Sequence, residues 1–196
     1  MTDGDVAATA LDGVFVFTPQ RIDDDRGWFV RTLDLAWCEE RGLECSFVHQ
    51  NQSRSRRGVL RGIHVRAGRG ETKLVRCARG SVVDHVVDVR PWSPTYGRSE
   101  RFVLDDEAHR HLYLPPFVAH GFQVVSDWAD VCYLHSRVHE PGSELTIRWD
   151  DPALALDWPL ADPVLVPRDA EAPRLAALDL TALFEQPGDR RSETEG

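Results

Sequence analysis

Short β-branched or aromatic segments, separated by clusters of Gly, Pro, Asp and Arg, dominate the chain from residue 14 onward. Candidate strands lie at 14–19, 28–32, 45–49, 58–66, 73–78, 81–89, 101–104, 111–114, 121–125, 131–138 and 144–149. Strands that follow one another at intervals of roughly 8–12 residues are typical of an all-β sandwich or barrel. The pattern therefore predicts an all-β fold.

In two of these segments the sequence indicates which strand face is polar and which is apolar. In 131–139 the odd positions from 133 onward are polar and titratable, and the even positions are largely apolar; this odd set is Tyr133, His135, Arg137 and His139. Alternate side chains of a strand point to opposite faces. The polar face is either a solvated outer surface or the lining of a cleft, and the tyrosine and two histidines favour the cleft. In 81–89 the face with Val83, His85, Val87 and Val89 is the more apolar one.

Helices are expected only at two places. Residues 34–41 suit a short helix, with Asp34 as its cap and Gly42 as its end. Residues 174–184 suit a helix near the C-terminus, after a stretch from 151 that is broken by X-Pro pairs. Residues 186–196 are polar and contain Pro and Gly, so we expect a single domain over 1–185 and a disordered tail over 186–196.

The length and net charge of the chain favour a single-domain protein that does not bind nucleic acid. The chain has 196 residues, which favours one domain, and a formal charge of −9, which disfavours binding to nucleic acid. It contains no apolar run near the roughly 18–20 residues that a membrane-spanning helix needs. The first residues lack the pattern of a signal peptide, and we expect a cytoplasmic protein. The four cysteines form no CxxC pair, so we expect four reduced thiols.

One spacing among the eight histidines suggests a metal site. The segment from Gly58 resembles the first motif of the cupin fold, with His64 and Glu71 at ligand positions and His120 after a Pro-containing turn. Two imidazoles and a carboxylate suit iron or manganese. Arg66, however, stands where a further histidine is expected, and a guanidinium beside a divalent cation is unfavourable. A metal-dependent cupin enzyme using His64, Glu71 and His120 is therefore one alternative.

A longer series of motifs resembles one cupin family in particular, the dTDP-4-dehydrorhamnose 3,5-epimerases. The resemblance runs from about residue 14 to residue 174. The segments that carry it are 25–29 (DRGWF), 51–53, 58–64 (GVLRGIH), 73–77 (KLVRC), 87–90, 93–97 (SPTYG), 119–122 (AHGF), Tyr133, Pro141 with Glu144, 149–152 (WDDP), Trp158 with Pro159, and Arg168 with Asp169.

The resemblance implies a cupin jelly roll, a double-sheet β-sandwich with few helices, that works as a homodimer without metal or cofactor. The implied substrate is a dTDP-linked 4-keto-6-deoxyhexose of deoxysugar biosynthesis, epimerised at C3, at C5 or at both through an enolate. His64 holds the position of the base and Asp169 that of its carboxylate partner. Lys73 matches the residue that stabilises the enolate oxygen, and Tyr133 matches the acid on the opposite face.

Further positions match substrate contacts of the family, because a nucleoside diphosphate brings about two negative charges that local cations must offset. The expected substrate-binding residues are Arg26, Phe29, Arg31, His49, Asn51, Arg61, His120, His139, Glu144 and Arg168.

Several positions depart from the family pattern. Val65 replaces a usual aromatic residue, Arg66 and His49 replace glutamines, and His139 replaces a common second tyrosine; Arg31 stands where many members have glutamate. A larger pocket at Val65 and a titratable His139 are expected to affect the choice of sugar or to restrict the reaction to one carbon. A non-catalytic or re-purposed sugar-nucleotide-binding cupin is the other alternative, and the retained His64, Tyr133 and Asp169 argue against it.

Overall fold

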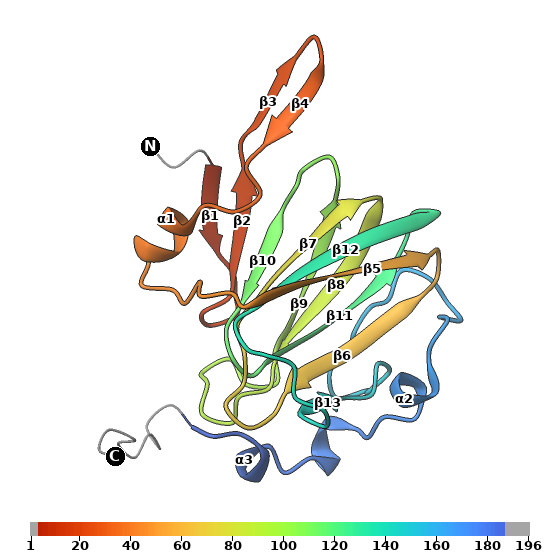
Figure 1. The fold of residues 1–196 in the computed structure, drawn as a ribbon. Coiled ribbons are helices and arrows are strands. Elements are labelled where there is room, and N and C mark those ends of the chain that lie inside the picture. Colours follow the sequence, from red (N-terminus) through yellow and green to blue (C-terminus); the bar gives the residue numbers. More distant parts are fainter. Residues whose placement is uncertain (1–3, 187–196) are drawn as a thin grey trace.

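A computed structural model describes residues 4–186 and shows two antiparallel sheets packed face to face (Figure 1). One sheet has the strand order β1-β2-β10-β7-β12-β5, the other β13-β6-β11-β8-β9. The first contains β1 (Gly4–Ala8), β2 (Phe15–Pro19), β5 (His49–Arg56), β7 (Lys73–Arg79), β10 (His111–Leu114) and β12 (Trp128–His135). The second contains β6 (Leu60–Arg66), β8 (Ser81–Asp88), β9 (Ser99–Asp105), β11 (Val118–Val124) and β13 (Glu144–Thr146). The predicted all-β jelly roll is confirmed.

The remaining elements are short. A separate hairpin consists of β3 (Arg21–Asp24) and β4 (Gly27–Val30), and the helices are α1 (Leu35–Glu39), α2 (Pro167–Ala170), a 3₁₀ turn (Leu175–Ala177) and α3 (Leu180–Leu183). Asp34 caps α1 as predicted, by accepting a hydrogen bond from the backbone N–H of Ala36. The helix expected over 174–184 is wrong as a continuous element, because the backbone is extended at Leu178. The proposed tail, 186–196, lies almost wholly outside the described residues.

Two strand predictions also need correction. Residues 45–48 are not a strand; the strand β5 starts at His49 and continues through a polar sequence to Arg56. This strand lies at the edge of its sheet, pairs only with β12 and leaves most of its side chains exposed, so its sequence shows no apolar alternation. β1 was not predicted, because its sequence, Gly-Asp-Val-Ala-Ala, has little apolar alternation.

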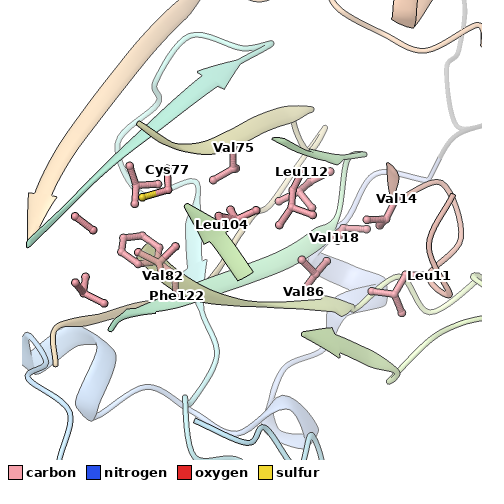
Figure 2. Close-up of a cluster of buried hydrophobic side chains, with 14 residues drawn as sticks. Leu11, Val14, Val75, Cys77, Val82, Val86, Leu104, Leu112, Val118 and Phe122 are labelled. Carbon is pink, nitrogen blue, oxygen red and sulfur yellow. The ribbon is translucent and has the colours of Figure 1, made fainter. Parts of the chain in front are cut away.

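The main core lies between the two sheets (Figure 2). Val75 and Leu112 from the first sheet meet Val82, Val86 and Phe122 from the second, and all five are buried. A second cluster covers the outer face of the β6–β11–β8 sheet, where Val87 and Val89 pack against the segment from Ile147 to Phe184. Both faces of β8 are therefore buried, which explains why its sequence shows no clean alternation.

The β3–β4 hairpin projects away from the sandwich (Figure 1). All of its residues are exposed except Val30, and Trp28 and Phe29 keep 52% and 64% of their surface accessible. The ring of Trp28 still contacts that of the buried His109, with centroids 4.5 Å apart. Within residues 4–186, no helix is long and apolar enough to cross a bilayer.

The expectation of four reduced thiols is wrong for one pair. Cys38, at the end of α1, forms a disulfide with Cys45, because the turn at Gly42 brings the chain back toward the helix. Cys77 and Cys132 are free and buried in the sandwich, as expected.

Candidate active site

A polar pocket of about 240 Å³ opens between the two sheets and is lined from both of them. Strands β5, β7 and β12 form one wall, and β6, β11, β13 and α2 form the other. The lining residues are Asn51, Gln52, Ser53, Arg61, His64, Lys73, His120, Phe122, Tyr133, His135, Glu144 and Arg168.

His64 is held by a buried carboxylate. Its Nε2 lies 2.9 Å from Oδ1 of Asp169, and Oδ2 of Asp169 accepts a hydrogen bond of 3.3 Å from the backbone N–H of Gly62. Burial alone would raise the pKa of Asp169, but the hydrogen bond and charge of His64, with the Gly62 N–H and Arg168, lower it. Nη2 of Arg168 also lies 3.2 Å from Nε2, but the carboxylate oxygen is nearer. Because an ionised carboxylate can only accept, Nε2 carries the proton and Nδ1 keeps a free lone pair. That lone pair makes Nδ1 a general base.

The backbone geometry behind this pair depends on two glycines. Gly62 of β6 and Gly121 of β11 approach so closely that a Cβ on either would collide with the other strand. This close approach accompanies an irregular register that sets His64 directly opposite His120. Asp169 is brought to His64 by α2, where Pro167 occupies the first turn, a position that proline favours.

A second histidine–carboxylate pair lies deeper. His120 Nδ1 is 3.2 Å from Oδ2 of Asp84, and both side chains are buried. Burial lowers the pKa of His120 even though Asp84 opposes this effect. His120 is therefore a neutral, fixed imidazole in the floor of the pocket.

Tyr133 faces the histidines from the other sheet. Its hydroxyl group lies 3.2 Å from Oγ of Ser53, and its ring is 6.2 Å from that of His120. Burial raises the pKa of the phenol well above its ordinary value, and the hydrogen bond to Ser53 offsets only part of this. The phenol stays protonated, so it is available as a proton donor.

Charged groups of both signs surround the pocket. Arg61 and Arg168 are exposed at its mouth, and Lys73 is buried inside it. Arg168 forms an ion pair of 2.7 Å with Glu144, whose Oε1 is 3.8 Å from His64 Nδ1. Burial would raise the pKa of Glu144, but His64, Lys73 and Arg168 lower it. The lining itself carries three cations and one carboxylate, Glu144, while Asp169, Asp84 and Glu71 lie behind it.

The structure gathers most of the residues that sequence analysis proposed for the site. His64, Lys73, Tyr133, Asn51, Arg61, His120, Glu144 and Arg168 line the pocket, and Asp169 lies directly behind His64. Five proposed residues do not line the pocket formed by this chain: Arg26, Phe29, Arg31, His49 and His139. Arg26 pairs with Asp24 on the hairpin, Arg31 pairs with Asp34, and His49 stacks on His135 beside the pocket.

Sequence analysis did not propose Gln52, Ser53 and Phe122 for the lining or Asp84 behind it. The interpretation of the polar face of 131–139 as a cleft lining is correct for Tyr133 and His135. That face ends with β12 at His135, so Arg137 and His139 leave the pocket.

One expectation about the site is wrong, and so is the metal site of one alternative. Val65 does not enlarge the pocket, because it follows His64 on the strand and packs in the outer cluster with Ile147 and Leu154. Glu71 does not join His64 and His120 as a metal ligand, since it is bound to Lys73, Arg66 and His135 instead. Among residues 4–186, no group of three or more His, Cys, Asp or Glu side chains is placed to hold a metal ion.

The double-sheet fold, with a histidine–aspartate pair on one wall and a partly buried tyrosine on the other, defines a cupin-type enzyme equipped for proton transfer at carbon. Residues 8–177 match the sequence model of the dTDP-4-dehydrorhamnose 3,5-epimerase family. The chain belongs to this family of epimerases, which are isomerases.

Similar proteins of other organisms are epimerases of the same family. A dTDP-4-dehydrorhamnose 3-epimerase of Streptomyces niveus is 43% identical over 85% of this chain and 81% of its own. A dTDP-4-dehydrorhamnose 3,5-epimerase of Methanothermobacter thermautotrophicus is 42% identical over 78% of this chain and 82% of its own.

Among solved structures, a 4-keto-6-deoxy sugar epimerase from the novobiocin gene cluster of Streptomyces spheroides superposes with a TM-score of 0.88. It is 38% identical, with 94% of each chain covered. A Legionella pneumophila epimerase solved in complex with dTDP-4-keto-L-rhamnose also has a TM-score of 0.88, at 37% identity, with 93% of this chain and 98% of that chain covered.

Proposed function

We propose that this protein epimerises a dTDP-linked 4-keto-6-deoxyhexose at C3, at C5 or at both, in deoxysugar biosynthesis. The observation that carries the proposal is the placement of His64, with its Asp169 partner, and Tyr133 on opposing walls of one pocket. A base and an acid on opposite sides of a ring are what an inversion of configuration requires.

The reaction divides among these side chains. The 4-keto group acidifies the neighbouring C–H bonds, and Nδ1 of His64 removes one of these protons while Asp169 stabilises the resulting imidazolium. The electron pair moves onto the ketone oxygen, and the ammonium group of Lys73, buried in the same pocket, stabilises this enolate oxygen. Tyr133 then donates its proton to the opposite face of the carbon. Exchange with solvent removes the proton from His64 and restores that of Tyr133.

The mouth of the pocket is suited to the diphosphate. Arg61 and Arg168 are exposed there, beside Asn51. A nucleoside diphosphate carries about two negative charges, and the chain has a formal charge of −9, so local cations must offset the repulsion between them. We therefore assign diphosphate binding to these arginines and sugar binding to the deeper residues.

The nucleoside needs a surface that this chain does not itself place at the pocket. The volume of about 240 Å³ is below the roughly 300–1,000 Å³ of ordinary ligand pockets. The hairpin that carries Arg26 and Phe29 projects away from the sandwich with its aromatic side chains exposed (Figure 1). We propose a homodimer in which the hairpin of each subunit reaches the pocket of the other, with Phe29 packing on the base and Arg26 contacting phosphate.

The proposal also retains a cytoplasmic location, because a doubly charged sugar nucleotide does not cross a bilayer and is used in the compartment that makes it. No role in nucleic-acid binding or at a membrane is proposed.

Proton NMR in deuterated buffer with dTDP-4-keto-6-deoxyglucose tests the function. Loss of the C3 and C5 proton signals, with inverted product, would identify a 3,5-epimerase, and loss of one signal would identify a mono-epimerase. Absence of exchange at both carbons, in protein that still binds dTDP, would contradict the proposal and favour a binding protein.

A further inference from the structure

Three adjacent strands place a row of basic side chains along one wall of the pocket. His49 of β5 pairs with His135 of β12, and His135 pairs with Lys73 of β7. Side chains at directly opposed positions share a face of the sheet. The rings of His49 and His135 stack with centroids 4.7 Å apart, and His135 and Lys73 both line the pocket.

The carboxylate of Glu71, whose side chain is 9% exposed, lies at the end of this row. Oε1 of Glu71 lies 3.3 Å from Nζ of Lys73, and its Oε2 lies 3.3 Å from both Nδ1 of His135 and Nη1 of Arg66. Burial alone would raise the pKa of Glu71. The hydrogen bond from His135 and the charges of Lys73, His135 and Arg66 outweigh this effect and lower the pKa to about 2. Glu71 is therefore an anion at every pH at which the protein is expected to work.

The contacts of His135 define the state of its ring. The carboxylate of Glu71 can only accept, so Nδ1 carries a proton and donates it. Nε2 lies 3.5 Å from Nδ2 of Asn51, which is a donor. In the neutral ring, Nε2 is therefore a hydrogen-bond acceptor beside two other pocket residues, Asn51 and Tyr133.

We propose that His135 is a further substrate-contacting residue and that Glu71 is the positioning residue that orients both His135 and Lys73. The inference rests on the proposed function and deepens it. Nε2 of His135 accepts a hydrogen bond from a hydroxyl group of the hexose ring, and Glu71 holds the ammonium group of Lys73 where the enolate oxygen forms. Glu71 thus orients His135, which contacts the bound sugar, and Lys73, whose contact with the ketone oxygen matters only as negative charge develops on that oxygen.

The two roles predict different kinetic effects. Glu71→Gln keeps the shape of the side chain but removes the charge that fixes Lys73, so kcat falls by about tenfold or more. His135→Phe removes only an acceptor for the bound sugar, so KM rises by up to about tenfold with a smaller change in kcat. Uniform loss of folded protein would reduce the apparent kcat of both variants and leave KM unchanged.

Glu140→Gln is the matched control. Glu140 is the other carboxylate on Arg66, 2.9 Å from Nη2, but its side chain is 74% exposed. It makes no ion pair with Lys73 or His135 among the described residues. Wild type, E71Q, E140Q and H135F are compared in the deuterium-exchange assay across a range of substrate concentrations. The proposal is overturned if E71Q matches E140Q in kcat, or if H135F keeps the wild-type KM.

Nitrogen NMR of the histidine rings tests the same geometry without any turnover. The resonances of His135 are assigned by their loss in H135F, and wild-type protein is expected to show the Nδ1–H tautomer. An Nε2–H tautomer would overturn the proposal even if E71Q does not fold. Wild-type protein that exchanges no substrate protons yet shows the expected tautomer would instead contradict the proposed function alone.

Discussion

Nε2 of His64 lies 2.9 Å from Oδ1 of Asp169, although 105 residues separate the two in the chain. Asp169 is almost completely buried, whereas the His64 side chain is 16% exposed. The carboxylate thus fixes the ring from behind and leaves the other nitrogen free to face a ligand.

Removal of either partner is expected to abolish or weaken proton abstraction. His64→Ala should lower the exchange rate by about 10³-fold or more, because no other group replaces the base. Asp169→Asn should lower it by roughly 10²-fold, since an amide permits the wrong tautomer. Asp150→Asn, which changes an exposed carboxylate paired with Arg148 outside the pocket, serves as the control. Wild-type exchange in H64A would contradict the assignment of the base.

Tyr133→Phe should separate abstraction from reprotonation. Because His64 is intact, solvent deuterium should still enter the substrate, while inverted product falls by about 10²-fold or more. Ser53→Ala removes only the hydrogen bond to the phenol, so its effect on product should stay within about tenfold. NMR that follows exchange and product together makes the measurement. Undiminished inversion in Y133F would remove the tyrosine from the mechanism.

Mixed dimers test whether the hairpin acts on the pocket of another subunit. The double variant Arg26→Ala with Phe29→Ala keeps His64, and His64→Ala keeps the hairpin. Each homodimer should be inactive or weak. A mixture that exchanges subunits should regain activity, because one of its two pockets has both an intact base and an intact hairpin. A mixture as inactive as its parents, with subunit exchange shown by mass spectrometry, would place the hairpin elsewhere.

The core histidine His111 should contribute to a loss of stability in mild acid. His111 is buried, and burial lowers its pKa to about 3 from an ordinary value of 6.5. The unfolded chain binds a proton near pH 6.5 and the folded chain does not, so stability is lost progressively as pH falls from 6.5 toward 3. His111→Leu should flatten this part of the curve, and His139→Gln, at an exposed position, should not. Urea unfolding at several pH values measures the slopes; equal slopes for wild type and H111L would contradict the explanation.

Chelation should leave the activity unchanged. The carboxylates nearest the pocket histidines already have partners: Asp169 with His64, Asp84 with His120 and Glu71 with Lys73. Protein dialysed against EDTA is expected to exchange substrate protons at the untreated rate. A rate that falls on chelation and returns with one particular divalent metal would revive the alternative of a metal-dependent cupin.

Most strands of the two main sheets could be predicted, because the sequence pattern of a strand is a local property of the chain. β-branched segments bounded by turn residues located most strands, and the alternation around Tyr133 identified a polar face that does line the pocket. The polar strand β5 was misplaced, because most of its side chains are exposed and its sequence therefore shows no apolar alternation. The identity of the base, its carboxylate and the acid came from the family resemblance, since spacing along the chain gives no distance across a sandwich.

The sequence alone therefore determined the class of fold, the strand segments and the residue types available for proton transfer. The tertiary structure decided which of these residues meet. Alternation shows that His64 and Val65 face opposite ways, but only the C-terminal segment, folded over the outer face, assigns Val65 to a core and His64 to a pocket. Likewise, the contacts of Glu71 with His135 and Lys73 exist only because β7 and β12 are neighbours. The physical reason is that side-chain direction is a local property of a strand, whereas burial and pairing depend on which layers are stacked against it.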